Sequence, residues 1–166
     1  AAIVEFPGVL YRGGAEQKIR KYLIDNNYVD TVIQLPANLF FGVSIATCII
    51  VLKKSKFENK TLFIDASQLF VHEGNKNKLS PENIDAIVAE YAEHKQVKHF
   101  SALVDNKVVA ENGYNLSVSS YVEAEDTRPQ TDIRELNERI RRIVAHENEL
   151  RADIDAIIAE LEAETL

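Results

Sequence analysis

Residues 28–54 read YVDTVIQLPANLFFGVSIATCIIVLKK, two apolar runs of strand length joined by a loop. Residues 29–35 and 47–52 are rich in β-branched side chains, and the breaker residues Pro36 and Gly42 lie between them. Strands of such continuous hydrophobicity are typically covered on both faces. The stretch therefore predicts two strands in the interior of an α/β sheet.

The segment before this stretch predicts a strand followed by a helix. Residues 2–10 form an extended apolar run broken by a Pro-Gly pair, and residues 11–14, YRGG, turn the chain into the helix. That helix carries Ile19, Tyr22 and Leu23 at helical spacing, with basic residues on its other faces, and two asparagines at 26–27 end it. Strand, helix, strand is the order of a parallel crossover unit, whereas the strand at 47–52 follows a loop and is expected to run antiparallel to its predecessor.

After this core the sequence predicts a further short strand at residues 61–64, a polar loop at 72–78 and a helix that opens on Ser80-Pro81. Residues 100–122 are turn-rich and predict a short hairpin or an irregular extension. The helix carries one apolar face at i, i+3, i+4, i+7 spacing, formed by Ile84, Ile87, Val88 and Tyr91.

The last third predicts one long helix after a polar hinge at residues 123–130. Apolar residues recur at spacings of three and four, with one polar break at Glu147. A helix of about 30 residues is about 45 Å long, so its stripe is expected to meet a partner helix, the alternative being that it folds back along its own domain. Glu147 either sets the register of such a pair or is solvated at its edge. The stripe consists of Ile133, Leu136, Ile140, Ile143, Leu150, Ile154, Ile157 and Leu161.

Charge is divided along the chain. Residues 1–60 hold eight Lys or Arg against five Asp or Glu, whereas residues 61–166 hold eleven against twenty-one. The acidic total argues against a nucleic-acid binder that uses its whole surface, but a local basic face suffices for phosphate contact. The predicted organisation is an α/β domain at 1–122, a hinge at 123–130 and a coiled-coil-like assembly helix at 131–166.

Several separated blocks carry a family resemblance: RGGAEQKIRKYLIDNN at residues 12–27, the stretch at 28–54, and ENGYNLSVSSYVEAEDTR at 111–128. Together they resemble the modification (M) subunit of type I restriction-modification systems, an adenine-specific DNA methyltransferase. One departure is Ala37, which stands where family members commonly carry a second proline. The Gly-rich cofactor segment and the Asn-Pro-Pro-aromatic motif of that family do not occur in these 166 residues.

The resemblance therefore implies the distal part of a Rossmann-like, S-adenosylmethionine-dependent methyltransferase sheet whose last strand is reversed. The absence of methionine and a start inside an apolar strand also suggest a piece of a longer chain. The complete subunit is expected to use S-adenosylmethionine and to work with a DNA-specificity (S) subunit, a second M subunit, a restriction subunit and DNA. These residues alone are expected to hold no cofactor, catalytic or metal site. Self-association through the last helix is a further expectation.

Candidate contacts to DNA or the target base lie in two places. Phe40, Phe41 and Gly42 occupy the loop between the central strands, where a methyltransferase would wall the pocket of a flipped base; the alternative is that both aromatic rings plug the loop against the core. Ser44 either bonds a phosphate or base or caps the strand. Basic candidates for phosphate contact are Arg12, Lys18, Lys53 and Lys54, which serve otherwise as solvated charges.

The remaining reactive side chains point to no other site. Cys48 sits in an apolar run and is expected to be a buried small hydrophobe, and the four histidines lack metal-ligand spacing. No secretory signal or bilayer-length apolar run is present, which predicts a soluble cytoplasmic protein with no membrane partner. Two alternatives to the methyltransferase remain: a non-catalytic helical assembly module or scaffold, and an unrelated α/β enzyme.

Overall fold

The computed structural model describes residues 1–125 and 132–164, and the chain divides into two compact units, Ala1–Glu125 and Asp126–Leu166. The first unit is built on a mixed five-stranded sheet in the order β1-β3-β2-β4-β7. Strand β3 pairs antiparallel with both β1 and β2, β2 pairs parallel with β4, and β4 pairs antiparallel with β7. The strands are β1 Ala2–Glu5, β2 Val29–Gln34, β3 Cys48–Leu52, β4 Lys60–Asp65 and β7 Ser101–Asp105.

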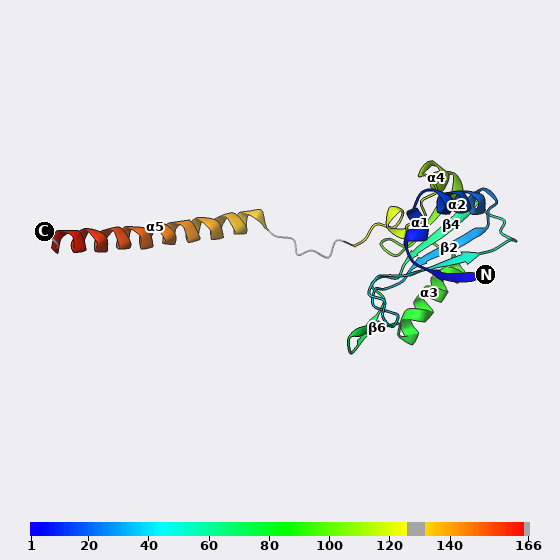
Figure 1. The fold of residues 1–166 in the computed structure, drawn as a ribbon, viewed down its shortest axis with the longest axis horizontal. Coiled ribbons are helices and arrows are strands. Elements are labelled where there is room, and N and C mark those ends of the chain that lie inside the picture. Colours follow the sequence, from blue (N-terminus) through cyan, green and yellow to red (C-terminus); the bar gives the residue numbers. More distant parts are fainter. Residues whose placement is uncertain (126–131, 165–166) are drawn as a thin grey trace. The chain divides into compact units, whose positions relative to one another are not determined.

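Helices cover both faces of this sheet (Figure 1). One core cluster lies under the helices on the first face and contains Leu10, Val32 and Phe63; the cluster on the other face contains Ile33, Leu62 and Ile87. The first face carries α1 Gly8–Tyr11, α2 Ala15–Asp25, α4 Asn106–Glu111 and the 3₁₀ turn η1 Val118–Ser120, and the other carries α3 Pro81–Glu93. A separate hairpin is formed by β5 Val71–Glu73 and β6 Lys76–Lys78.

The two strands predicted from residues 28–54 are confirmed, as is their antiparallel pairing. The reversed strand does not end the sheet, however. It inserts between β1 and β2, which are therefore parallel to each other without being neighbours, and the sheet continues on the far side of β2 with β4 and β7. The crossover through α2 thus leaves room for one strand between the two that it joins.

Three local predictions are wrong. Residues 8–11 form a helical turn instead of extended chain, because Pro7 adopts αR geometry before it. The loop predicted at 72–78 is the β5–β6 hairpin, turned at Gly74 with φ +63°. Residues 100–122 contain strand β7 and helix α4, since the side chain of Asp105 accepts a hydrogen bond from Lys107 N and starts a helix there.

The apolar faces of the two surface helices differ from those predicted. In α2 the buried residues are Arg20 and Ile24, while Ile19 and Tyr22 are exposed. The Arg20 guanidinium donates to the carbonyl oxygens of Val9 (2.8 Å) and Tyr114 (2.7 Å), and burial lowers its pKa. These bonds join α1, α2 and the segment after α4, so Arg20, which the sequence placed among the basic residues on the other faces of the helix, is structural.

Helix α3 begins as predicted, with Ser80 and Asn83 forming a reciprocal capping box and Pro81 in the first turn. Only part of its predicted apolar face is covered. Ile87 is buried, but Ile84 and Val88 are exposed, and together they line an apolar recess over Ile33. That recess lies on one side of an open sheet edge.

The second unit contains the predicted long helix, α5 Ile133–Glu164. The predicted apolar stripe is exposed along it. The hinge predicted at 123–130 lies, from residue 126 on, outside the described residues. Within the two described ranges, no helix combines the length and the hydropathy that crossing a bilayer requires.

Candidate functional site

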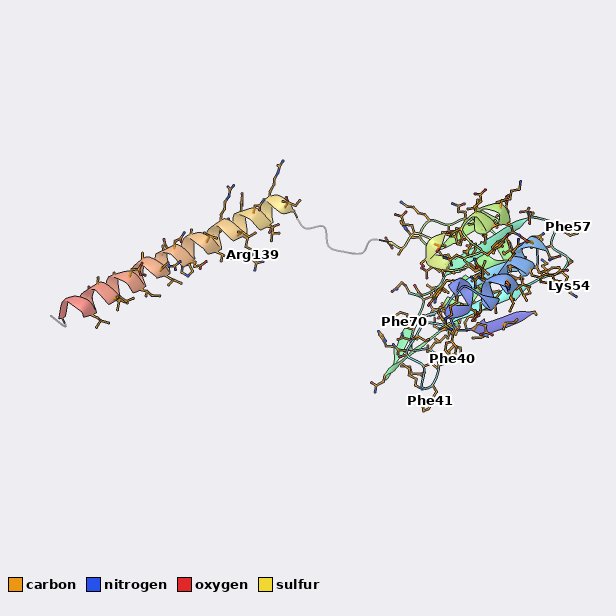
Figure 2. The ribbon with its side chains drawn as sticks, turned by 45° about the horizontal axis from the view of Figure 1, so that its top comes forward. Phe40, Phe41, Lys54, Phe57, Phe70 and Arg139 are labelled. Carbon is orange, nitrogen blue, oxygen red and sulfur yellow. The ribbon has the colours of Figure 1, made fainter. Side chains whose placement is uncertain are left out.

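The loop at residues 35–47 lies at the carboxyl ends of strands β1 and β2, where β3 starts. Strands β1 and β2 both end there and β3 begins there, because Glu5 and Gln34 pair with Cys48. In open α/β sheets ligands bind in the crevice outside the carboxyl ends of parallel strands. Phe40 and Phe41 project at this edge (Figure 2), which makes it the candidate functional site.

One recess at this edge, the Thr47 recess, has a volume of about 180 Å³. Phe6 from the end of β1 and Phe40 from the loop supply two aromatic walls, and Thr47 lies at the start of β3. The lining is completed by Val4, Glu5 and Val43.

Thr47 is the distinctive group of this recess. Its residue is 4% exposed, and its hydroxyl is the buried side-chain polar atom without a hydrogen-bond partner among the described residues. Its backbone carbonyl is satisfied, accepting from Leu35 N and Gln34 Nε2. A buried hydroxyl without a partner costs about 1–3 kcal/mol, so such a group calls for an explanation.

A second recess, about 210 Å³, shares Phe40 and Val43 with the first and is called the hairpin recess. Gly42, with φ +72°, and Ser44 line it from the loop, and Lys76 lines it from the β5–β6 hairpin. Asn77 fastens the hairpin to the loop: its backbone amide donates to Asn38 O (3.1 Å) and its side chain to Ala37 O (2.8 Å). The candidate loop is therefore held by a second element.

The aromatic pair of the loop is not plugged into the core. Phe40 is 41% exposed and lines both recesses, while Phe41 is 91% exposed and carries Lys76 Nζ 3.9 Å from its ring centre. A cation over an exposed ring is worth about 0.5–1 kcal/mol and orients the ring. The predicted loop residues thus form one surface: Phe40, Phe41, Gly42 and Ser44. The structure adds Lys76 and Phe6 to it, which the sequence did not predict.

The basic candidates do not all join that surface. Arg12 follows β1 and α1 at the same edge, and its guanidinium lies against Gly8, where an added Cβ would be 2.9 Å from it. Lys18 is exposed on α2. Lys53 and Lys54 follow β3 and lie at its opposite end, about 17 Å away for a strand of five residues. Figure 2 shows Lys54 far from Phe40 and Phe41.

The turn that carries Lys53 and Lys54 also holds an aromatic residue that was missed. Phe57 is 99% exposed beside these lysines. Lys56 serves a different purpose, since its amine donates to the carbonyl oxygen of Val29 and burial lowers its pKa. This turn is a second basic and aromatic surface, separate from the candidate site.

The remaining reactive groups are structural. Cys48 is buried as predicted, its thiol contacts Glu5 O, and burial raises its pKa to about 11. His94 lies 3.6 Å from the buried Asp30, and His99 contacts Glu123 O. Within residues 1–125 and 132–164, no cluster of three or more His, Cys, Asp or Glu side chains could hold a metal ion.

Both faces of the sheet are open beside β1. On one face a recess of about 360 Å³ is lined by Ile49, Val51, Ile84 and Val88; on the other a recess of about 230 Å³ is lined by Ile3, Ile19, Leu23 and Ile50. Strand β1 pairs with β3 alone and is exposed over Ala2, Ile3 and Val4. Among the described residues, β1 thus has no neighbouring strand on its outer side, and apolar surface is uncovered on both faces of the sheet beside it.

Comparison with known proteins identifies the group to which this arrangement belongs. Residues 1–130 match the family model described as N-6 DNA Methylase. The chain belongs to the N-6 DNA methylase family. It is 46% identical over 165 residues to the methylase subunit of the type I restriction enzyme MpnII of Mycoplasma pneumoniae, covering 99% of this chain and 30% of that protein. The resemblance inferred from the sequence is confirmed.

Two further relatives agree. The methylase subunit of the type I restriction enzyme MjaVII of Methanocaldococcus jannaschii is 36% identical over 96% of this chain and 28% of its own length. The crystal structure of a type I restriction-modification system methyltransferase subunit from Streptococcus thermophilus matches with a TM-score of 0.72 and 42% identity, over 74% of this chain and 26% of that one. The chain thus spans less than a third of the length of these N-6 DNA methylase relatives.

Two buried threonines allow a test of the unpartnered hydroxyl. Thr61 is buried with its hydroxyl 2.8 Å from Asn106 Oδ1 and 3.2 Å from Val29 O, whereas that of Thr47 has no such partner among the described residues. We expect Thr61→Val to destabilise the chain by about 1–2 kcal/mol, and Thr47→Val to be neutral or stabilising by up to about 1 kcal/mol, because it removes an unsatisfied polar group. Urea unfolding measures both, and equal destabilisation by the two changes would contradict the assignment.

Proposed function

We propose that the chain is the distal part of the methyltransferase domain, with the C-terminal helix, of a type I M subunit that transfers a methyl group from S-adenosylmethionine to adenine N6 in DNA. The single observation that carries this is the family match, and the exposed strand β1 agrees with it. In this assignment the α/β part, residues 1–122, supplies one side of a Rossmann-like sheet, and the hinge and helix follow it.

The open edge fits a sheet that continues. A strand with unpaired amides and carbonyls is a template for another strand, and the apolar recesses on its two faces suit two covering helices. Upstream residues in a chain as long as these relatives would place a parallel neighbour beside β1, and the cofactor would bind at the carboxyl ends of those strands. The 166 residues themselves are then expected to bind no S-adenosylmethionine.

The Thr47 recess suits a contact to the target base. Adenine N6 is unreachable inside a duplex, so such an enzyme flips the nucleotide out and holds the base between aromatic or apolar side chains. Phe40 is the proposed stacking wall and Phe6 its neighbour, while the Thr47 hydroxyl would bond a ring nitrogen or the exocyclic amine. The recess would be closed on its open side by the upstream part of the sheet.

The residues around that recess are proposed to meet the DNA backbone. Phe41, held under Lys76, and Ser44 lie on the loop beside Gly42, and Arg12 lies at the same edge. Lys18 is proposed as a further phosphate contact. Lys53 and Lys54, at the other end of β3, would touch a different part of the DNA, and each such contact contributes chiefly salt-dependent affinity.

The long helix is proposed to dock the specificity subunit. Its exposed apolar stripe, Ile133 to Leu161, is of the kind that packs in a helical bundle. With a second M subunit, and a restriction subunit in the full complex, this would assemble the enzyme on DNA. If the chain instead acts without the catalytic part, the same stripe supports the second candidate, a helical assembly module.

Cofactor titration tests the methyltransferase assignment. Calorimetry would compare S-adenosylmethionine binding to these 166 residues and to the same chain extended by its native upstream sequence. We expect heat only from the extended chain, since the cofactor site lies in the added part. Absence of binding by both would favour the assembly module, and binding by the 166 residues alone would contradict the location of the cofactor site.

Methyl transfer by the complete subunit with its specificity partner tests the base contact. Phe40→Ala is expected to lower kcat/KM on DNA at saturating cofactor by about 5- to 150-fold, since a base stacked on an aromatic ring is worth about 1–3 kcal/mol. Val108→Ala is the control, because Val108 is exposed on α4, which none of the proposed DNA contacts uses, and it should change the rate less than about twofold. If the control substitution lowered kcat/KM more than Phe40→Ala did, Phe40 would not be the residue that stacks on the base.

A further inference from the structure

Helix α5 carries an apolar stripe that is exposed along residues 133–161. Ile133, at 72% exposed, and Leu136, at 45%, span the range of exposure for the stripe. Its residues repeat every three and four positions, so in a supercoiled pair of helices they would face one seam.

The charges beside this seam are segregated along the helix. Residues 133–146 hold four arginines against two glutamates, whereas residues 147–161 hold five acidic residues against one arginine. Intrahelical pairs use some of them, namely Arg142 with Glu138 (3.9 Å) and His146 with Glu149 (3.8 Å), all largely exposed. The first half of the helix is therefore basic and the second half acidic.

The flanking positions that set helix orientation show the same division. The residue preceding each first apolar position of a heptad lies at the edge of the seam, where charges of paired helices meet. From the second heptad on, these residues are Arg139 and His146 in the first half, and Asp153 and Glu160 in the second half. Arg139 is labelled on the helix in Figure 2.

Two copies of this helix are complementary in one direction only. In an antiparallel pair these edge residues face the same set on the other copy, so Arg139 meets Glu160 and His146 meets Asp153, each twice by symmetry. In a parallel pair they face the opposite edge of the seam instead, which consists of Asn137, Val144, Arg151 and Ile158 and offers no such partners.

We infer that α5 pairs antiparallel with α5 of a second copy of this chain, in the register that places Arg139 opposite Glu160. This register puts Ile143 opposite Ile154 and Ile140 opposite Ile157, so the stripe stays continuous across the pair. Glu147 lies near the two-fold axis, opposite Leu150, and is the weak point of the seam.

This pairing goes beyond the proposed function, because it concerns the chain in the absence of a specificity subunit. It uses the stripe that such a subunit would use, so the two associations exclude each other. It rests on the charges and spacing of α5 and not on the methyltransferase assignment. Its failure would leave the cofactor and base-contact tests unaffected.

Sedimentation equilibrium of the whole chain and of charge variants tests the pairing. The wild-type chain should dimerise, Arg139→Glu should weaken the dimer roughly tenfold because two attractive pairs become repulsive, and adding Glu160→Arg should restore it. Ile140→Asp with Leu150→Asp should abolish dimerisation while circular dichroism of the α/β unit is unchanged. A monomeric wild type would overturn the proposal. So would a chain with both Arg139→Glu and Glu160→Arg that dimerises more weakly than the chain with Arg139→Glu alone.

Disulfide trapping tests the direction independently. Ile143→Cys and Ile154→Cys chains, mixed and oxidised, should give the crossed disulfide, because these positions face each other only in the antiparallel register. Native Cys48 is buried with a pKa raised to about 11, so it stays out of the reaction at neutral pH. Homodisulfides of each single variant in place of the crossed product would show a parallel pair and overturn the proposal.

Discussion

The insertion of a reversed strand between β1 and β2 is the constraint on which the rest of the first unit depends. Because β3 must run back along β2, the loop at 35–47 has to turn at the carboxyl ends of β1 and β2. That places Phe40, Thr47 and Phe6 around one recess. The same reversal carries Lys53, Lys54 and Phe57 to the other end of the sheet, so residues close in sequence belong to two surfaces.

Buried polar contacts hold the elements that fix this arrangement. Asn106 donates to Asn59 Oδ1 and Asn27 Oδ1 and lies 2.8 Å from the Thr61 hydroxyl, which ties α4 to the loops at the far end of the sheet. Arg20 ties α2 to the neighbouring segments by donating to the backbone carbonyls of Val9 and Tyr114. Against this background of satisfied groups, the hydroxyl of Thr47, unpartnered among the described residues, is the exception.

The sequence predicted what periodicity and turn chemistry determine locally. Continuous β-branched runs indicated β2 and β3, and the Ser80-Pro81 start indicated α3. It did not predict which face of α2 is buried, since Arg20 is covered only because Val9 and Tyr114 reach it from distant segments. Nor did it predict β7, whose five residues became a strand by pairing with β4. For the site, the loop aromatics could be named, but Phe6 and Lys76 join them only through the fold.

Amide hydrogen exchange of strand β1 tests the central claim most directly. The comparison is between these 166 residues and the same chain with its native upstream sequence, with α5 as the internal reference. If the sheet continues past β1, exchange at Ala2–Glu5 should slow by at least about tenfold in the extended chain, and Ile3 and Val4 should become covered. Equal exchange in both chains would contradict the account, because β1 would then be a true edge of the sheet.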